Sequence, residues 1–240
     1  MDITKFTKPA RKVLKLKKCG AVIVAAGSAS RMGGIDKVMA ELGGEPMIAR
    51  TVRGFLECDA VSEIVIVTRE DLILPITKLT QGCEKVKAVV AGGKSRQESV
   101  GKGLAALSKD IKLAAIHDGA RPLITWQLID CCVRAANTYG AAAPAIPVKD
   151  TIKSVEGGVV VNTPDRSKLR AVQTPQVFDI DLLKGALLKA YQDGAQITDD
   201  CSAVERLGMK VKIVEGDEKN LKVTTPMDLK IAEMLLEDMK

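Results

Sequence analysis

Short apolar runs and longer amphipathic segments alternate along most of this chain. The apolar runs, which are rich in β-branched residues and which we expect to be strands, are residues 21–24, 64–68, 86–91, 113–117 and 141–148. The segments with apolar residues at helical spacing are residues 47–57, 95–107 and 125–139. Continuous apolar strands that alternate with helices are typical of a parallel sheet covered on both faces. We therefore predict an α/β fold with three layers and a mostly parallel sheet.

The pattern changes after Pro147. Residues 149–172 are mostly polar and lack helical spacing, while Gly157 and Gly158 separate two short β-branched stretches, which predicts a β-hairpin. Because a hairpin is marginally stable alone, a protruding one usually packs on another chain, so we expect a dimerisation arm and a homodimer. Beyond the arm, the pattern predicts a helix over 179–191, a helix from Asp199 or Asp200, a strand over 211–214 and a helix from Pro226.

Length and charge indicate one domain with a basic extension. At 240 residues and 46% hydrophobic content, the chain can bury one large core. The net charge of +6 comes from residues 1–19, where seven lysines and arginines face a single aspartate, while the rest of the chain is balanced. We expect an N-terminal extension over 1–19 and one domain over 20–240. With 2% aromatic residues to stack on bases, the domain lacks the pattern of a nucleic-acid-binding protein.

The cysteines and the apolar stretches limit the class of protein further. Six cysteines show no Cys-x-x-Cys spacing, and the single histidine cannot complete an ordinary structural zinc site with them. Reduced thiols are typical of a cytoplasmic protein, which is the localisation we expect. No apolar stretch approaches the roughly 20 residues that a membrane span needs, and the N-terminus lacks the apolar core of a signal peptide. We expect no membrane association.

A loop of small residues follows the first predicted strand. It runs from Ala25 through Gly27 and continues to Arg31 and Lys37. Such a loop places backbone N–H groups and two cations at the carboxyl end of a strand, which suits a polyphosphate ligand. The dinucleotide pattern Gly-x-Gly-x-x-Gly is absent, and the Gly-Lys-Ser sequence at 93–95 lacks the first glycine of a Walker motif. The loop favours nucleotidyl transfer, with a tight turn bearing solvated cations as the alternative.

Further motifs follow the loop in a fixed order. They are Gly92-Gly93 with Arg96 and Ser99, Asp118-Gly119-Ala120-Arg121-Pro122, Pro147-Val148-Lys149-Asp150-Thr151, Asp165-Arg166, Gln173-Thr174-Pro175-Gln176, Thr198-Asp199-Asp200 and Asn220-Leu221-Lys222-Val223-Thr224. Together with the glycine loop they resemble the 2-C-methyl-D-erythritol 4-phosphate cytidylyltransferase family of the non-mevalonate isoprenoid pathway, from about residue 20 to the end. The resemblance implies a Rossmann-like nucleotidyltransferase fold with a dimerising hairpin arm.

The reaction implied by this resemblance transfers a cytidylyl group from CTP to a polyol phosphate, 2-C-methyl-D-erythritol 4-phosphate, and releases pyrophosphate. Because neither phosphate must lose a proton at neutral pH, positioning and electrostatics can carry such a reaction without a general base. Mg²⁺ is the implied cofactor, held mainly by triphosphate oxygens, with no protein metal ligands assigned. The alternatives are a ribitol-5-phosphate cytidylyltransferase and a non-catalytic nucleotide-binding regulator.

The resemblance also implies roles for individual residues. The catalytic set comprises Arg31 and Lys37, which match the transition-state stabilisers, and Lys222 and Arg166, which match the residues that position the attacking phosphate. The implied polyol-phosphate ligands are Asp118, Arg121, Thr151, Arg166 and Lys222, of which Thr151 and Arg166 act in the neighbouring subunit's pocket. The alternative for Asp118 is a contact with the metal or with the ribose. The implied nucleotide ligands are Ala25, Ala26, Gly27, Gly93, Lys94 and Ser99. The chain departs from the family at Gly119, where alanine is common, and at Lys94, where an acidic residue is common.

Two conspicuous polar groups have structural interpretations. His117 ends a predicted buried strand, where we expect it to be structural rather than catalytic. Thr198, Asp199 and Asp200 suggest a metal site at first sight, but Asp or Thr at a helix start is usually an N-cap, which is the role we expect there.

Overall fold

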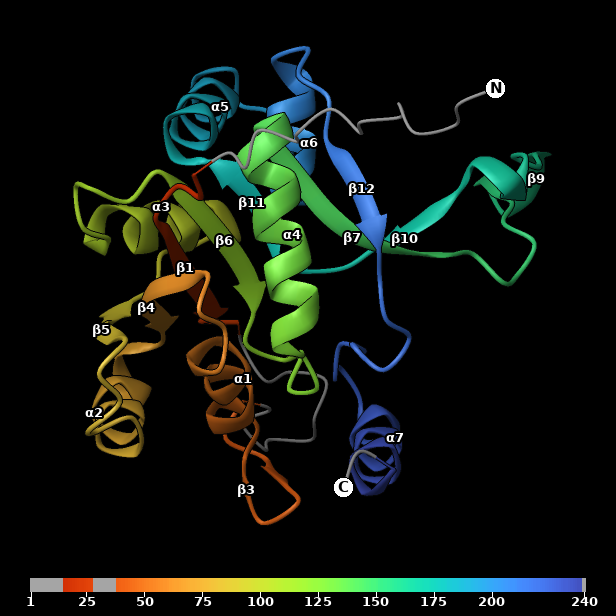
Figure 1. Ribbon diagram of the computed structural model, residues 1–240. Coiled ribbons are helices and arrows are strands. Elements are labelled where there is room, and N and C mark those ends of the chain that lie inside the picture. The colour runs from red at the N-terminus through yellow and green to blue at the C-terminus, as the bar shows by residue number, and fades with distance from the viewer. Residues whose placement is uncertain (1–14, 28–37, 239–240) are drawn as a thin grey trace, which may run out of the picture.

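The computed structural model describes residues 15–27 and 38–238. Within these ranges an eight-stranded sheet crosses the molecule in the order β10-β7-β11-β6-β1-β4-β5, with β12 beside β7 (Figure 1). The strands are β1 (Cys19–Ala25), β4 (Val61–Thr68), β5 (Val86–Ala91), β6 (Leu113–Asp118), β7 (Ala141–Pro147), β10 (Arg170–Val172), β11 (Gln176–Asp179) and β12 (Lys212–Glu215). Only β10 and β11 run antiparallel to their neighbours. The prediction of a mostly parallel sheet is confirmed.

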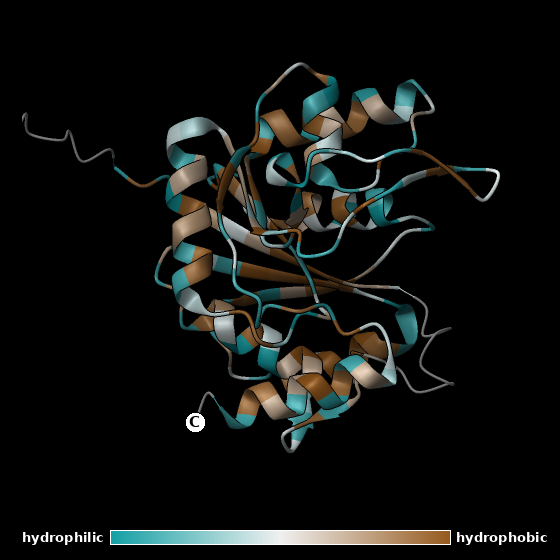
Figure 2. Ribbon diagram, turned by 90° about the vertical axis from the view of Figure 1, so that its right-hand side faces the viewer, coloured by the Kyte–Doolittle hydropathy of each residue, from teal (hydrophilic) through white to brown (hydrophobic). Residues whose placement is uncertain are grey.

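Helices cover both faces of this sheet and complete the three predicted layers. Those on one face are α1 (Met47–Leu56), α2 (Glu70–Leu79) and α4 (Trp126–Tyr139), and those on the other are α3 (Arg96–Ala106), α5 (Ile180–Gln192) and α6 (Asp200–Arg206). Both faces of β1 are apolar, because Ala21 and Ile23 join the first core cluster while Val22 joins the second. Figure 2 shows the apolar strands in the interior, with mixed apolar and polar helices outside them.

The C-terminal helix α7 (Pro226–Glu237) lies outside these layers. It packs on a short ribbon formed by β2 (Glu41–Leu42) and β3 (Glu45–Pro46). Val223, which precedes the helix, is fully buried in the same apolar cluster, and its N–H donates to the carbonyl of Ala120 at 2.8 Å. The segment that leads into α7 is therefore fixed beside the end of β6.

The predicted arm is a β-hairpin that projects from the body of the molecule (Figure 1). β8 (Ser154–Glu156) and β9 (Val159–Asn162) pair antiparallel around Gly157 and Gly158. The φ angles of these glycines are 56° and 81°, a left-handed conformation that glycine adopts without strain. The hairpin prediction is confirmed, and a short 3₁₀ turn (Arg166–Lys168) follows before β10 returns to the sheet.

All helices and strands predicted from the sequence pattern are present, but α2, β11 and the short strands β2, β3 and β10 were not predicted. α2 contains Pro75, which removes one helical hydrogen bond and obscures the helical signal. Burial of its Leu72 and Ile76 side chains against the sheet compensates for the lost hydrogen bond. β11 is short, and it is recognisable only by its place between β6 and β7, where Val177 and Phe178 are fully buried. None of the helices in the described ranges is both long and apolar enough to cross a membrane.

Loops meet at one edge of the sheet, where the parallel strands β1, β5 and β6 end. The N–H of Gly92 donates to the carbonyl of Thr68 at 2.7 Å, and the N–H of Gly119 donates to the carbonyl of Val24 at 2.8 Å. From β1 the chain continues to β4, which is the neighbour of β1 on one side, whereas β6 is its neighbour on the other side. This edge is therefore a topological switch point, where open α/β sheets bind ligands.

Candidate active site

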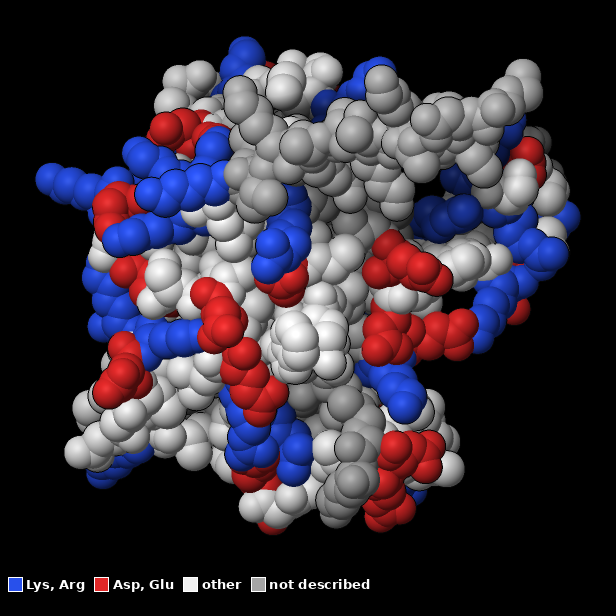
Figure 3. Space-filling model, in the orientation of Figure 1, with Lys and Arg blue, Asp and Glu red and all other residues white. Residues whose placement is uncertain are grey.

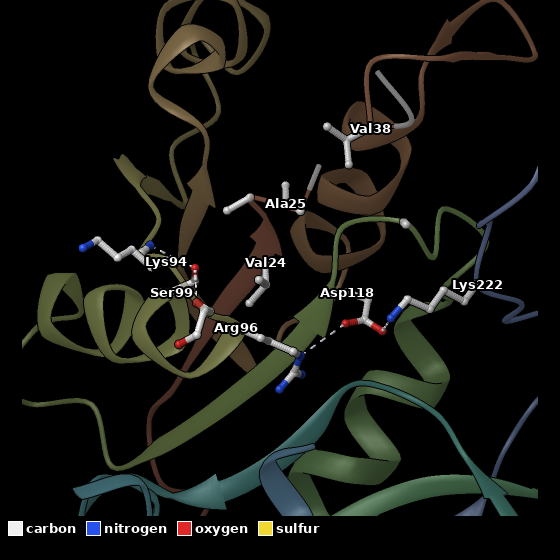
Figure 4. A pocket seen from close by; sticks show the side chains of 13 residues that line it. Val24, Ala25, Val38, Lys94, Arg96, Ser99, Asp118 and Lys222 are labelled. Atoms are coloured by element: carbon white, nitrogen blue, oxygen red, sulfur yellow. Dashed lines mark hydrogen bonds and ion pairs between the residues drawn. The ribbon is translucent and has the colours of Figure 1, made fainter. Parts of the chain in front are cut away.

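A pocket of about 370 Å³ lies at this edge of the sheet (Figure 4). Its described lining residues are Val24, Ala25, Ala26, Gly27, Val38, Gly93, Lys94, Ser95, Arg96, Ser99, Asp118, Ala120 and Lys222. The wall beside α3 presents loop backbone and the Ser99 hydroxyl, whereas the opposite wall carries Asp118 and Lys222. Such a division suits a ligand that has a polar ring at one end and an anionic group at the other.

Close backbone packing shapes the wall beside α3. A side chain at Gly92 would place its Cβ 2.5 Å from the Cβ of Ala26, so glycine lets the loops after β1 and β5 touch. The Ser99 hydroxyl donates to the carbonyl of Ser95 at 2.9 Å and accepts the N–H of Gly93 at 3.0 Å. A hydroxyl has one donor and two acceptor sites, so one acceptor site remains. In this arrangement Ser99 can accept a hydrogen bond from a ligand amino group and has no proton left for a ligand carbonyl.

Lys94 contributes its main chain to this wall. Its N–H donates to the Glu98 carboxylate at 2.9 Å, and its exposed side chain points away from the pocket in Figure 4. The Lys94 side chain therefore affects the charge of the rim and leaves the backbone of the wall in place.

Asp118, at the end of β6, is the centre of the charged wall. Lys222 Nζ lies 2.9 Å and Arg121 Nε 3.5 Å from its Oδ2, and Arg96 Nε lies 3.9 Å from its Oδ1. Burial alone would raise the pKa of Asp118, but the charges of Lys222, Arg96 and Arg121 lower that pKa to about 2. Asp118 and Asp200, which pairs with Arg96, are two carboxylates beside three cations, so this wall keeps a positive charge that suits a phosphate.

A buried hydrogen-bond network holds the loop that carries Asp118. Thr174 Oγ1 accepts the backbone N–H of Asp118 at 3.1 Å and lies 3.0 Å from His117 Nδ1. Arg121 donates to the carbonyl of Asn220 at 2.7 Å, and the Asn220 amide donates to the carbonyl of Thr174 at 2.8 Å. Burial lowers the pKa of His117 to about 3, so its ring is neutral at pH 7. The network joins the loop after β6 to the segment before α7.

The structure brings together many of the residues that the sequence predicted, but not all of them. Those that line the pocket are Ala25, Ala26, Gly27, Gly93, Lys94, Ser99, Asp118 and Lys222, and Arg121 is buried next to Asp118. Thr151 and Arg166 are exposed residues of the arm and are not among the described residues that line this pocket. Arg166 instead donates to the carbonyl of Lys149 at 2.6 Å. Arg31 and Lys37 lie outside the described residues.

Arg96 lines the pocket, although the sequence analysis assigned it no role. Its guanidinium Nη2 lies 2.8 Å from Oδ2 of Asp200, a residue with no exposed surface. Asp199 is the N-cap of α6 and forms a capping box with Ser202, as predicted, whereas Asp200 pairs with Arg96. Arg96 stands within a recognisable motif, but no local pattern connects it with Asp200.

Carboxylate ligands for a metal are scarce in the pocket. Within residues 15–27 and 38–238, no group of three or more His, Cys, Asp or Glu side chains could hold a metal ion. Asp118 is the carboxylate among the described lining residues, and its oxygens face cations. This donor set does not fit a Mg²⁺ ion held by the protein, so we derive no catalytic step through one.

Comparison with known proteins gives a consistent result over nearly the whole chain. Residues 19–238 match the family model of 2-C-methyl-D-erythritol 4-phosphate cytidylyltransferase. The enzyme of that name from Caldanaerobacter subterraneus is 43% identical over 228 residues, which cover 90% of this chain and 97% of the relative. The one from Symbiobacterium thermophilum is 47% identical over 219 residues, which cover 90% of this chain and 92% of the relative.

Solved structures agree with the sequence relatives. The crystal structure of 4-diphosphocytidyl-2C-methyl-D-erythritol synthase from Anaerococcus prevotii superposes with a TM-score of 0.85 at 30% identity, and the match covers 93% of this chain and 100% of that one. The crystal structure of 2-C-methyl-D-erythritol 4-phosphate cytidylyltransferase from Thermus thermophilus gives a TM-score of 0.77 at 31% identity. That match covers 92% of this chain and 99% of the other.

Proposed function

This chain belongs to the 2-C-methyl-D-erythritol 4-phosphate cytidylyltransferase family, and we propose on that premise that it transfers the cytidylyl group of CTP to 2-C-methyl-D-erythritol 4-phosphate and releases pyrophosphate. The observation that carries the proposal is the pocket itself. Its α3 wall offers an acceptor for a ring amino group, and its opposite wall offers cations for a phosphate. The two ends of the pocket thus match the two substrates.

In the proposed reaction, an oxygen of the 4-phosphate attacks the α-phosphorus of CTP. A new P–O bond forms, the bond from the α-phosphorus to the oxygen bridging the β-phosphorus breaks, and pyrophosphate leaves with the bonding electron pair. No proton has to be removed from the attacking phosphate, so the buried, neutral His117 is not needed as a base. Negative charge accumulates around the α-phosphorus, and stabilising that charge is the main catalytic task.

Cations supply this stabilisation in our proposal. The Lys222 side chain is 42% exposed and lies at the pocket, so its ammonium can turn from Asp118 to the attacking phosphate. Arg31 and Lys37 would act at the α-phosphorus, Arg31 through its fork of donors and Lys37 as a compact charge. Asp118 and Arg121 would bind the polyol phosphate, with Asp118 accepting hydrogen bonds from its hydroxyl groups.

The α3 wall accounts for the choice of nucleotide. Cytosine carries an amino group where uracil carries a carbonyl, and the free acceptor site of Ser99 suits only the amino group. The backbone of Ala25, Ala26, Gly27 and Gly93 would contact the remaining polar atoms of the ring. Gly92 lets the two loops touch, and in our proposal this close packing narrows the wall so that it favours a pyrimidine over a purine.

We further propose a homodimer formed through the arm. The four valines of β8 and β9 are between 53% and 67% exposed, and a marginally stable hairpin with this much exposed apolar surface is stabilised by packing on another chain. Thr151 and Arg166 would then complete the pocket of the partner subunit. Mg²⁺ would enter as part of the CTP complex, held by triphosphate oxygens.

A pyrophosphate-release assay tests the proposed function. Purified protein with Mg²⁺, CTP and 2-C-methyl-D-erythritol 4-phosphate is expected to release pyrophosphate and to form the cytidine diphosphate conjugate. Ribitol 5-phosphate in place of the second substrate serves as the competing reaction. Turnover of ribitol 5-phosphate alone would refute the substrate assignment, and CTP binding without any pyrophosphate release would identify a non-catalytic nucleotide-binding protein.

A further inference from the structure

A buried ion pair connects the first turns of α3 and α6 at the edge of the pocket. Arg96 Nη2 lies 2.8 Å from Asp200 Oδ2, and the Asp200 side chain has no exposed surface. Arg96 is 32% exposed at its side chain and lines the pocket, so one end of the pair reaches the ligand site while the other end is closed off from water.

Stability of the two helices explains only half of this pair. Asp200 is the first residue of α6, where the helix dipole favours a carboxylate, but Arg96 is the first residue of α3, where the dipole disfavours a cation. Burial raises the pKa of Asp200, and the nearby charge of Arg96 offsets this increase in pKa only in part. Among the described residues, neither oxygen of the Asp200 carboxylate accepts a hydrogen bond, and the 2.8 Å contact of Oδ2 with Arg96 is an ion pair. Buried pairs of this kind often stabilise a protein no better than apolar side chains do, so the pair needs a reason beyond the fold.

The backbone around Asp200 is held rigidly. Gln176 Oε1 accepts the N–H groups of Asp200 and Cys201, both at 3.1 Å, and Gln176 Nε2 donates to Asp199 at 2.7 Å. The capping box between Asp199 and Ser202 closes the same turn. Because Gln176 belongs to the central sheet, Asp200 is a fixed anchor for any side chain that pairs with it.

Arg96 extends from this anchor toward Asp118 (Figure 4). Its Nε lies 3.9 Å from Asp118 Oδ1, whereas Lys222 and Arg121 both lie beside Oδ2. In the described part of the chain, Arg96 is therefore the cation on the Oδ1 side of the carboxylate. When Lys222 turns to a substrate phosphate, Asp118 loses its closest partner, and Arg96 keeps the carboxylate oriented.

We propose that Arg96 and Asp200 are positioning residues of the cytidylyltransferase reaction: Asp200 anchors Arg96, and Arg96 fixes the Asp118 carboxylate in the orientation that accepts hydrogen bonds from the polyol phosphate. The inference rests on the proposed function, in which Asp118 contacts that substrate. Neither Arg96 nor Asp200 touches the reacting atoms, so both act through Asp118.

A double-mutant cycle tests this mechanism. The affinity for 2-C-methyl-D-erythritol 4-phosphate is measured by titration calorimetry, and steady-state kcat and KM are measured in parallel. Arg96→Met removes the cation 3.9 Å from Asp118 Oδ1 and is expected to weaken binding and raise KM for the polyol phosphate by about tenfold, the size of effect expected when a partly buried ion pair loses one partner. In the Asp118→Asn background, Arg96→Met is expected to have little further effect. Equal losses in both backgrounds would overturn the proposal.

A second pair of variants separates positioning from folding. Arg96→Met combined with Asp200→Leu replaces the ion pair with apolar side chains, so the protein is expected to melt near the wild-type temperature and still show the loss of binding. Restored binding in this double variant would assign the pair a purely structural role and overturn the proposal. Arg134→Met, which breaks the exposed Arg134–Asp130 pair on α4, is the matched control and is expected to leave both affinity and turnover unchanged.

Measurements on the wild-type protein distinguish a failure of the positioning role from a failure of the proposed function. A wild type that neither binds the polyol phosphate nor releases pyrophosphate refutes the proposed function and this inference together. A wild type that binds and turns over substrate, with Arg96→Met unchanged in KM and affinity, refutes only the positioning role.

Discussion

Asp118→Asn removes the carboxylate around which Lys222, Arg96 and Arg121 gather, with little change of volume. The pKa of Asp118 is about 2 in the folded protein, compared with an ordinary value of 3.8. Because one pKa unit corresponds to about 1.4 kcal/mol, this difference stabilises the fold by about 2 kcal/mol at pH 7. Asparagine resembles a carboxyl group that is always protonated, so the variant is expected to lose about 2 kcal/mol of unfolding free energy at pH 7.

The loss should depend on pH in a defined direction. Since the pKa of Asp118 is lower in the folded protein than in the unfolded chain, its stabilisation is fully present above pH 3.8 and is lost as the pH falls toward 2. The difference in unfolding free energy between wild type and Asp118→Asn should therefore shrink on acidification. At pH 3 it should be roughly half of its value at pH 7.

Urea unfolding followed by circular dichroism at pH 7 and pH 3 measures this difference. Asp71→Asn is the control, because Asp71 forms an exposed ion pair with Arg69 and exposed pairs contribute little to stability. The control should change the unfolding free energy far less than Asp118→Asn at pH 7. Equal stability of Asp118→Asn and wild type at pH 7, or a difference that stays constant down to pH 3, would refute the electrostatic reasoning.

Other consequences of the pocket and the arm can be tested in the same way. Ser99→Ala should lower the ratio of kcat/KM for CTP over UTP by about tenfold, and an unchanged ratio would contradict the acceptor role. Gly92→Ala should push the Ala26 loop away and weaken CTP binding in calorimetry by roughly tenfold, while wild-type affinity would show that the loops need not touch. Arg166→Ala and Lys222→Ala should each be nearly inactive. In an equal mixture re-equilibrated as dimers, half of the dimers contain both variants and have one intact site of two, so about a quarter of the activity should return. Absence of this recovery would argue against a shared site.

Much of the fold was predictable because it follows from local patterns. The apolar runs of β1, β4, β5, β6 and β7 are continuous, and the residue pair Gly157-Gly158 allows few conformations other than a turn. By contrast, β11 and α2 were not predicted. Their local signals are weak, and burial of side chains such as Val177 and Ile76 against distant strands decides their structure.

The residues of the pocket likewise fall into those that the sequence predicted and those that it did not. Residues of the loops after β1 and β5 and of the Asp118 segment could be chosen from the sequence, because loops that follow parallel strands meet at one edge. Lys222 was chosen by resemblance, and its ion pair with Asp118 places it there in the structure. Arg96 was passed over, because an arginine at the start of a helix looks like an ordinary solvated side chain until its partner is known.

The alternation of strands and helices, the hairpin and the glycine loops follow from local sequence, since each depends on side-chain periodicity or backbone freedom within a few neighbouring residues. The contacts of Asp200 with Arg96 and of Arg96 with Asp118 arise only when the chain folds. Ion pairs form between groups that folding brings within a few ångströms and removes from water, and neither their distance nor their burial is encoded in any short stretch of the chain.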